Sequence, residues 1–263
     1  MKVLWIVIGV VFVLYLLVLS ALYYAQERLI FHPTTLSQEH RFSFGQPYTE
    51  IWFDASGVSL HGLRFPHKKS RGVIVYFHGN AGSLDSWGHV ATDLRSFPYE
   101  VWIYDYRGYG KSGGTITSEE QLHTDARAFL QEVRRVHPDT ELIFYGRSLG
   151  SGIAANLAQE FAPKMLILET PYYNFPDVVS SIYPFVPSFL VRYKLRTDLS
   201  LLATHLPVHL LHGTRDELIP YDSSVRLAKL RQNITLHTFE GGGHNNLPSY
   251  KAYRDVMTSI LER

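Results

Sequence analysis

Three residues of this chain combine into a set that activates a nucleophile: Ser148, Asp216 and His244. A serine hydroxyl is a weak nucleophile, so it needs a base within hydrogen-bond reach, and that base needs an acid to orient it. Of the thirteen histidines, His244 is the best candidate for the base, because it follows three glycines after an expected strand. The set predicts acyl transfer, with Ser148 as nucleophile, His244 as base and Asp216 as acid.

Ser148 lies in a G-x-S-x-G pattern at residues 146–150. The apolar run 141–145 before it reads as a buried strand, and residues 151–158 after it read as a helix. A serine in so tight a strand-to-helix turn has a strained backbone, and Gly146 and Gly150 let strand and helix approach. The turn raises the hydroxyl above the sheet edge. It also aims the amide of Leu149 at the position where an oxyanion develops.

The acid has two candidates. Asp216 follows the expected strand 208–212, and Glu169 ends the expected strand 165–168 before it. The carboxyl ends of parallel strands share one edge of a sheet, so both carboxylates are expected near Ser148. The placement usual for this motif favours Asp216, and Glu169 stays as the alternative.

The second oxyanion donor is expected in the loop after the strand 72–77. Asn80 lies there, between Gly79 and Ala81. We expect its backbone amide and that of Leu149 to share the negative charge of the oxyanion. His205 and His209 have a metal-like spacing. Pro207 separates them and His209 falls in a strand, so no metal site is expected, and the pattern implies no metal or organic cofactor.

Strands and helices alternate along most of the chain. The expected strands are 48–54, 58–65, 72–77, 101–104, 141–145, 165–168, 208–212 and 234–239. The expected helices are 85–95, 118–136, 151–158, 221–230 and 249–261. This order predicts an α/β fold with a mostly parallel eight-stranded sheet and helices on both faces.

The alternation is interrupted at residues 171–206, a stretch of 36 residues with four prolines and many aromatic side chains. It is too long for an ordinary connection and predicts a helical cap insertion. The aromatic residues either pack this cap onto the domain or form an acyl-chain pocket whose mouth faces a bilayer. In the second case the basic residues Arg192, Lys194 and Arg196 would attract anionic headgroups.

The amino-terminal stretch 3–25 carries no charge and is long enough to cross a membrane. It predicts a single transmembrane anchor at residues 1–25, followed by a stalk at 26–45 and the globular domain at 46–263. A cleavable signal peptide is the alternative, disfavoured by the length of the apolar run. The flanking charges are nearly balanced and favour a non-cytoplasmic domain only slightly, so the side of the membrane stays open.

Composition excludes several classes of function. A length of 263 residues with 46% hydrophobic side chains suits one domain with a sizeable core. The net charge of +1 gives no reason to expect a nucleic-acid partner. The chain has no cysteine, which excludes disulfides, thiol nucleophiles and cysteine-ligated zinc.

Five motifs carry a resemblance to the α/β-hydrolase superfamily, in which the order serine, acid, histidine is typical. They lie at residues 76–82, 105–112, 146–150, 212–216 and 243–246. More narrowly, the chain resembles the single-pass membrane-anchored, bud-emergence-related branch, which is similar to serine aminopeptidase-like and depalmitoylating members. Residues 28–33 also look like that branch, whereas Thr170 departs from it, because a serine is more usual there. The resemblance implies the same roles for Ser148, Asp216 and His244.

The expected function is therefore a membrane-anchored serine hydrolase that cleaves an ester, thioester or amide through an acyl-Ser148 intermediate. Its partners would be a small-molecule or acyl substrate, with a lipid as one option, and the membrane through its amino-terminal helix. Two alternatives remain. One is an acyltransferase on the same scaffold, although H-x-x-x-x-D follows none of the histidines. The other is a catalytically silent binding module, which would have no reason to keep all three residues.

Overall fold

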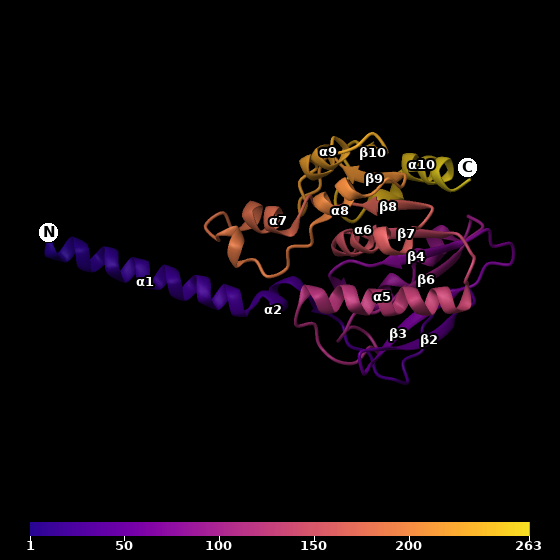
Figure 1. The fold of residues 1–263 in the computed structure, drawn as a ribbon, viewed down its shortest axis with the longest axis horizontal. Coiled ribbons are helices and arrows are strands. Elements are labelled where there is room, and N and C mark those ends of the chain that lie inside the picture. Colours follow the sequence, from indigo (N-terminus) through magenta and orange to yellow (C-terminus); the bar gives the residue numbers. More distant parts are fainter. Residues whose placement is uncertain (263) are drawn as a thin grey trace.

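The computed structural model describes residues 1–262 and contains a central sheet of eight strands (Figure 1). The sheet order is β10-β9-β8-β7-β4-β6-β3-β2. The strands β4 and β6 to β10 run parallel, whereas β3 is antiparallel to both β2 and β6. Their bounds are β2 Thr49–Ala55, β3 Val58–Phe65, β4 Val73–Phe77, β6 Glu100–Tyr104, β7 Leu142–Arg147, β8 Met165–Glu169, β9 Val208–Gly213 and β10 Ile234–Phe239. The predicted fold class is confirmed.

Helices cover both faces of the sheet, as the alternating pattern predicts. On one face, side chains such as Val75 and Phe144 pack against α5 (Glu119–Val136), α6 (Leu149–Phe161), α8 (Thr197–Ala203) and α9 (Asp222–Ala228). On the other face, the alternate residues Ile74 and Ile143 pack against α3 (Leu84–Trp87), α4 (Val90–Leu94) and α10 (Lys251–Leu261). Because successive side chains of a strand point to opposite faces, a sheet covered on both sides has strands that are apolar throughout.

The helix expected at 85–95 is two short helices, α3 and α4, separated at Gly88. The side chain of Ser83 caps α3 by accepting a hydrogen bond from the amide of Asp85. The ring of Phe44 presses on the break, where a Cβ on Gly88 would lie 2.4 Å from its Cζ. The interruption between α3 and α4 thus coincides with a contact from Phe44, a residue that is distant in the sequence and that no local pattern reveals.

Residues 26–45, predicted to form a stalk, lie against the domain instead of standing free. They begin with α2 (Gln26–Ile30), and the two-residue strand β1 (His32–Pro33) pairs in parallel with β5 (Ala81–Gly82). The side chains of Ile30, Phe31, Phe42 and Phe44 are buried. Residues 26–45 pack against the domain because burying these large apolar side chains is favourable.

The amino-terminal helix α1 (Lys2–Tyr24) projects away from the domain (Figure 1). It is long and apolar enough to cross a membrane, with a mean hydropathy of 2.9 in its most apolar stretch, and most of its side chains are exposed. The predicted cap, residues 171–206, contains α7 (Phe175–Ile182), the 3₁₀-helix η1 (Ser188–Leu190) and α8. Its α7 end extends in the same direction as α1 (Figure 1). The predicted domain boundaries at 25, 45, 171 and 206 stay predictions.

Candidate active site

Ser148 stands between the end of β7 and the start of α6 with φ +51° and ψ −119°. This positive φ is strained for a residue with a side chain, and the packing of the two flanking glycines stabilises it. A Cβ on Gly150 would lie 2.0 Å from the Phe77 carbonyl oxygen, and one on Gly146 would lie 2.5 Å from the Gly150 carbonyl oxygen. The glycines of the motif are thus required by the close approach of strand and helix, as predicted.

The structure brings Ser148, His244 and Asp216 together in one hydrogen-bonded chain. His244 Nε2 lies 3.1 Å from Ser148 Oγ, and His244 Nδ1 lies 2.8 Å from Asp216 Oδ2. His244 comes from the loop after β10 and Asp216 from the loop after β9. Since Asp216 is a carboxylate, it accepts from Nδ1–H, which leaves Nε2 able to accept the serine proton.

Asp216 is held as an anion by four hydrogen bonds. Its Oδ1 accepts from the amides of Leu218 and Ile219, both at 2.9 Å, and its Oδ2 accepts from His212 Nε2 at 3.1 Å as well as from His244. Burial raises the pKa of Asp216, but the hydrogen bonds from His212 and His244 outweigh it and bring this pKa well below its usual range. These hydrogen bonds therefore favour the charged form of the Asp216 carboxylate, which is the form that orients His244.

Glu169, the alternative acid, has partners other than His244. Its Oε2 accepts hydrogen bonds from the hydroxyls of Tyr145 and Tyr253, and its Oε1 lies 3.2 Å from Arg147 Nε. None of these partners is His244. The structure thus gives Glu169 a buried polar cluster of its own.

Two side chains that the sequence analysis did not single out as site residues support this arrangement. His212 Nε2 lies 3.1 Å from both the Ile219 carbonyl oxygen and Asp216, so Nε2 carries the proton, and His212 Nδ1 lies 2.6 Å from Ser224 Oγ. Arg147 donates to the His244 carbonyl oxygen at 3.3 Å and stacks over Trp87 at 5.2 Å. Arg147 is part of the serine motif, so its place was visible, but its partners are distant in the sequence.

Asn80 and Leu149, the expected oxyanion donors, line one pocket together with Ser148 and His244. The loop that carries the Asn80 amide is held firmly. The Asn80 carbonyl oxygen accepts from the His32 amide at 2.9 Å and from the Tyr109 hydroxyl at 2.6 Å, and its side-chain amide donates to the Ile30 carbonyl oxygen at 2.9 Å. The role of the two amides stays a prediction.

The pocket above Ser148 has a volume of about 350 Å³ and a mainly apolar wall. This volume is in the range of small-molecule sites. Apolar side chains come from α2, from the cap and from the loop after β9: Leu29, Ile30, Tyr172, Phe175, Val178, Ile182, Leu218 and Ile219. None of the residues that line it, all within the described part of the chain, is an aspartate or glutamate. The arrangement suits an uncharged acyl group beside a nucleophile.

Comparisons with known proteins show which family the chain resembles. Residues 68–202 match the family model described as serine aminopeptidase, S33. The chain is 30% identical to protein bem46 of Schizosaccharomyces pombe over 76% of this chain and 70% of bem46. It is 31% identical to the lysophosphatidylserine lipase ABHD12 of Xenopus tropicalis over 67% of this chain and 51% of the lipase.

Among solved structures, the esterase Pf2001 of Pyrococcus furiosus superposes with a TM-score of 0.72 at 17% identity. The match covers 88% of this chain and 98% of the esterase. At this identity the likeness concerns the fold.

Proposed function

This chain belongs to the α/β-hydrolase superfamily and is a hydrolase, and on that premise we propose that it is a membrane-anchored serine hydrolase that cleaves acyl esters or thioesters. The observation that carries the proposal is the hydrogen-bonded chain from Ser148 through His244 to Asp216, set at the floor of an apolar pocket. Such a chain is the arrangement by which a serine hydroxyl becomes a nucleophile.

In the proposed reaction, Ser148 Oγ attacks the substrate carbonyl carbon while His244 Nε2 takes the hydroxyl proton. The amides of Leu149 and Asn80 donate hydrogen bonds to the developing oxyanion. His244 then gives its proton to the leaving alkoxide or thiolate, which departs and leaves an acyl-Ser148 ester. A water molecule that loses its proton to His244 attacks this ester, and His244 returns the proton to Ser148 Oγ as the carboxylic acid departs. Asp216 stabilises the imidazolium at each step.

The pocket wall favours esters and thioesters over peptides with a free amino terminus. A peptide ammonium would need a carboxylate in the pocket, and the described residues that line it contain none. The apolar side chains gain free energy by covering methylene groups of an acyl chain, about 0.8 kcal/mol for each one buried. We therefore infer an acyl chain as the group bound above Ser148.

The proposed anchor is α1. Its 23 residues span about 35 Å, more than the roughly 30 Å of a hydrocarbon core. The Tyr15 hydroxyl donates a hydrogen bond of 2.9 Å to the Phe185 carbonyl oxygen, and Leu19 is buried, so the helix contacts the cap. Such contacts favour a helix that stays with the folded protein over a signal sequence that is removed.

The test is labelling with a fluorophosphonate, which reacts with activated serines. The wild-type protein should be labelled, and Ser148→Ala should not be. Ser151→Ala is a matched control, because Ser151 is one helical turn away and donates to the Ser148 carbonyl oxygen at 2.6 Å. Labelling that persists in Ser148→Ala would assign the chemistry to another residue. Turnover of thioesters, esters and aminoacyl amides by the labelled protein would then rank the leaving groups.

A further inference from the structure

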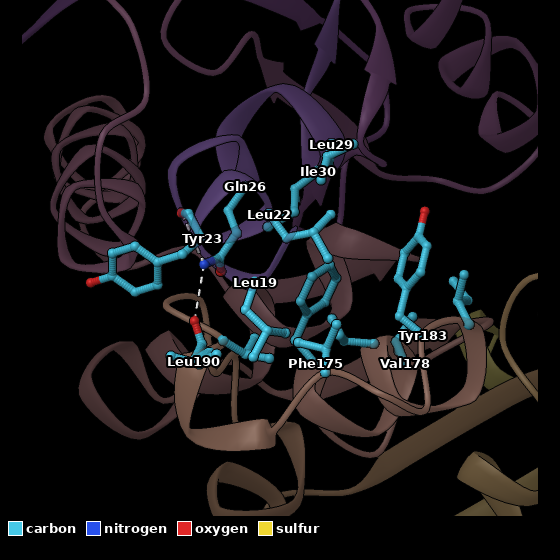
Figure 2. A pocket seen from close by; sticks show the side chains of 14 residues that line it. Leu19, Leu22, Tyr23, Gln26, Leu29, Ile30, Phe175, Val178, Tyr183 and Leu190 are labelled. Atoms are coloured by element: carbon cyan, nitrogen blue, oxygen red, sulfur yellow. Dashed lines mark hydrogen bonds between the residues drawn. The ribbon is translucent and has the colours of Figure 1, made fainter. Parts of the chain in front are cut away.

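A second apolar cavity, of about 110 Å³, lies between the amino-terminal helices and the cap (Figure 2). Side chains from α1 and α2 face those of α7 and the segment after it (Figure 2). The helical side consists of Leu19, Leu22, Tyr23, Gln26, Leu29 and Ile30. The opposite side includes Phe175, Val178, Val179 and Ile182. Its volume is similar to that of engineered apolar cavities that bind benzene.

This cavity adjoins the pocket above Ser148. Five residues line both spaces: Leu29, Ile30, Phe175, Val178 and Ile182. Side chains of α2 and α7 therefore form a wall that the two spaces share. The two cavities, both mainly apolar, thus lie next to each other between α1 and Ser148.

The first turn of α2, which directly follows α1, is fixed to the cap. Gln26 Nε2 donates to the Leu190 carbonyl oxygen at 3.0 Å, and Gln26 Oε1 accepts from the Arg192 amide at 2.8 Å. Glu27 pairs with Arg192 at 2.8 Å and accepts from the Tyr193 hydroxyl at 3.0 Å. The part of the cavity wall contributed by α2 is thus held in place, and with it the end of α1 that precedes it. Arg192 is engaged in this contact, which weakens its expected role toward headgroups.

The tip of the cap, residues 182–189, lies alongside the middle of α1. Tyr15, which bonds to Phe185, precedes Tyr24 by nine residues, or about 14 Å of helix. If α1 crosses a bilayer, the tip enters the hydrocarbon of one leaflet, which is about 15 Å deep. Its exposed side chains suit that environment, since Ile182, Phe185 and Phe189 are about half exposed or more.

The backbone of the tip is also adapted to an apolar surrounding, where unpaired polar groups are costly. Pro184 and Pro187 have no N–H to satisfy. The Val186 amide donates to the Tyr183 carbonyl oxygen at 3.0 Å, and the Phe185 carbonyl oxygen accepts from Tyr15. The apolar tip thus contacts α1 at Tyr15, and the apolar cavity begins about one helical turn further along the helix, at Leu19.

We propose that the acyl chain of a membrane-resident ester reaches Ser148 sideways from the bilayer, through the cavity between α1 and α7, with α1 as one wall of its path. This inference rests on the proposed function and adds the origin of the substrate. A long acyl chain stays in an apolar environment from the leaflet to the pocket, so it avoids crossing water. A short, water-soluble ester does not need this path.

The experiment uses the full chain reconstituted in phosphatidylcholine vesicles, with p-nitrophenyl palmitate dissolved in the bilayer and p-nitrophenyl butyrate in the water. Leu22→Trp fills the cavity from α1, and Val179→Trp fills it from the cap. Each should lower the ratio of kcat/KM for palmitate to that for butyrate at least tenfold. Leu17→Trp is the matched control on the exposed side of α1, and it should leave both values unchanged.

Each result decides a different question. An unchanged ratio in Leu22→Trp and Val179→Trp overturns the sideways path. If one of the two variants does not fold, the other decides. A wild-type protein that hydrolyses neither ester, or whose turnover survives Ser148→Ala, refutes the proposed function instead.

The depth of the cap tip gives a second readout, for which the absence of cysteine from the chain is convenient. Phe189→Cys labelled with bimane should show blue-shifted emission and quenching by lipids brominated on their acyl chains. Lys68→Cys is the control, because the loop before β4 lies at the opposite edge of the parallel strands. Equal, water-like emission from both positions would place the tip outside the bilayer and overturn the proposal.

Discussion

Replacing Asp216 by asparagine tests the orienting role of the acid at a single atom. Oδ1 of Asp216 accepts from two backbone amides, so an asparagine is expected to keep its carbonyl oxygen there. Its NH₂ group then takes the place of Oδ2, opposite His244 Nδ1 and His212 Nε2. An NH₂ group can only donate, so His244 keeps its proton on Nε2 and cannot accept one from Ser148.

The expected loss follows from this change of tautomer. In serine proteases the equivalent change lowers kcat by about 10⁴, or roughly 5.5 kcal/mol of barrier. Here the new NH₂ also opposes the N–H of His212, an uncompensated contact that costs about 1–3 kcal/mol of stability. We therefore expect a kcat for p-nitrophenyl butyrate about 10⁴-fold below wild type, together with a lowered midpoint of urea unfolding.

Glu169→Gln is the comparison, because it makes the same chemical change in the rival acid. Glu169 accepts hydrogen bonds from Tyr145 and Tyr253 and forms an ion pair with Arg147, and neither kind of interaction joins it to His244. The kcat of Glu169→Gln should therefore fall by about tenfold or less. Steady-state rates of both variants, measured in the same detergent, give the ratio. A larger loss in Glu169→Gln than in Asp216→Asn would refute the assignment of the acid.

Three further results are expected. A chain that begins at Gln26 should be soluble and turn over p-nitrophenyl butyrate, since the proposed chemistry lies in the domain; loss of turnover with an intact fold, judged by circular dichroism, would tie α1 to the reaction itself. In a series of p-nitrophenyl esters, kcat/KM should rise severalfold per added carbon before levelling off, because each buried methylene contributes about 0.8 kcal/mol; equal rates for acetyl and octanoyl esters would contradict an acyl pocket. Burial lowers the pKa of His61 and of His78 to about 4. The unfolded chain takes up these protons near pH 6.5, before the folded protein does, so the free energy of unfolding should drop by about 2 kcal/mol per histidine between pH 7 and pH 5. Urea titrations at the two pH values measure this drop, and a His61→Asn variant that shows the full wild-type drop would exclude His61 as a contributor.

Local sequence determines most of the secondary structure of this protein. Apolar runs such as 73–77 and 208–213 are strands because they are short, bounded by turn residues and covered on both faces of the sheet. The serine turn was equally visible, because glycine at both flanking positions is required wherever strand and helix approach so closely. The apolar character of α1 is likewise a property of composition alone.

Only the tertiary structure decided which distant side chains meet. Glu169 is the last residue of β8, and Asp216 lies in the loop after β9. Only Asp216 forms a hydrogen bond with His244, because Glu169 is bonded to Tyr253 and other residues instead. Arg147 and His244, whose carbonyl oxygen it contacts, are 97 residues apart, so no local pattern reveals this contact. The packing of residues 26–45 and the contact of Tyr15 with the cap have the same origin. Periodicity reports which face of an element is buried, whereas the identity of the group that covers it depends on the assembled fold.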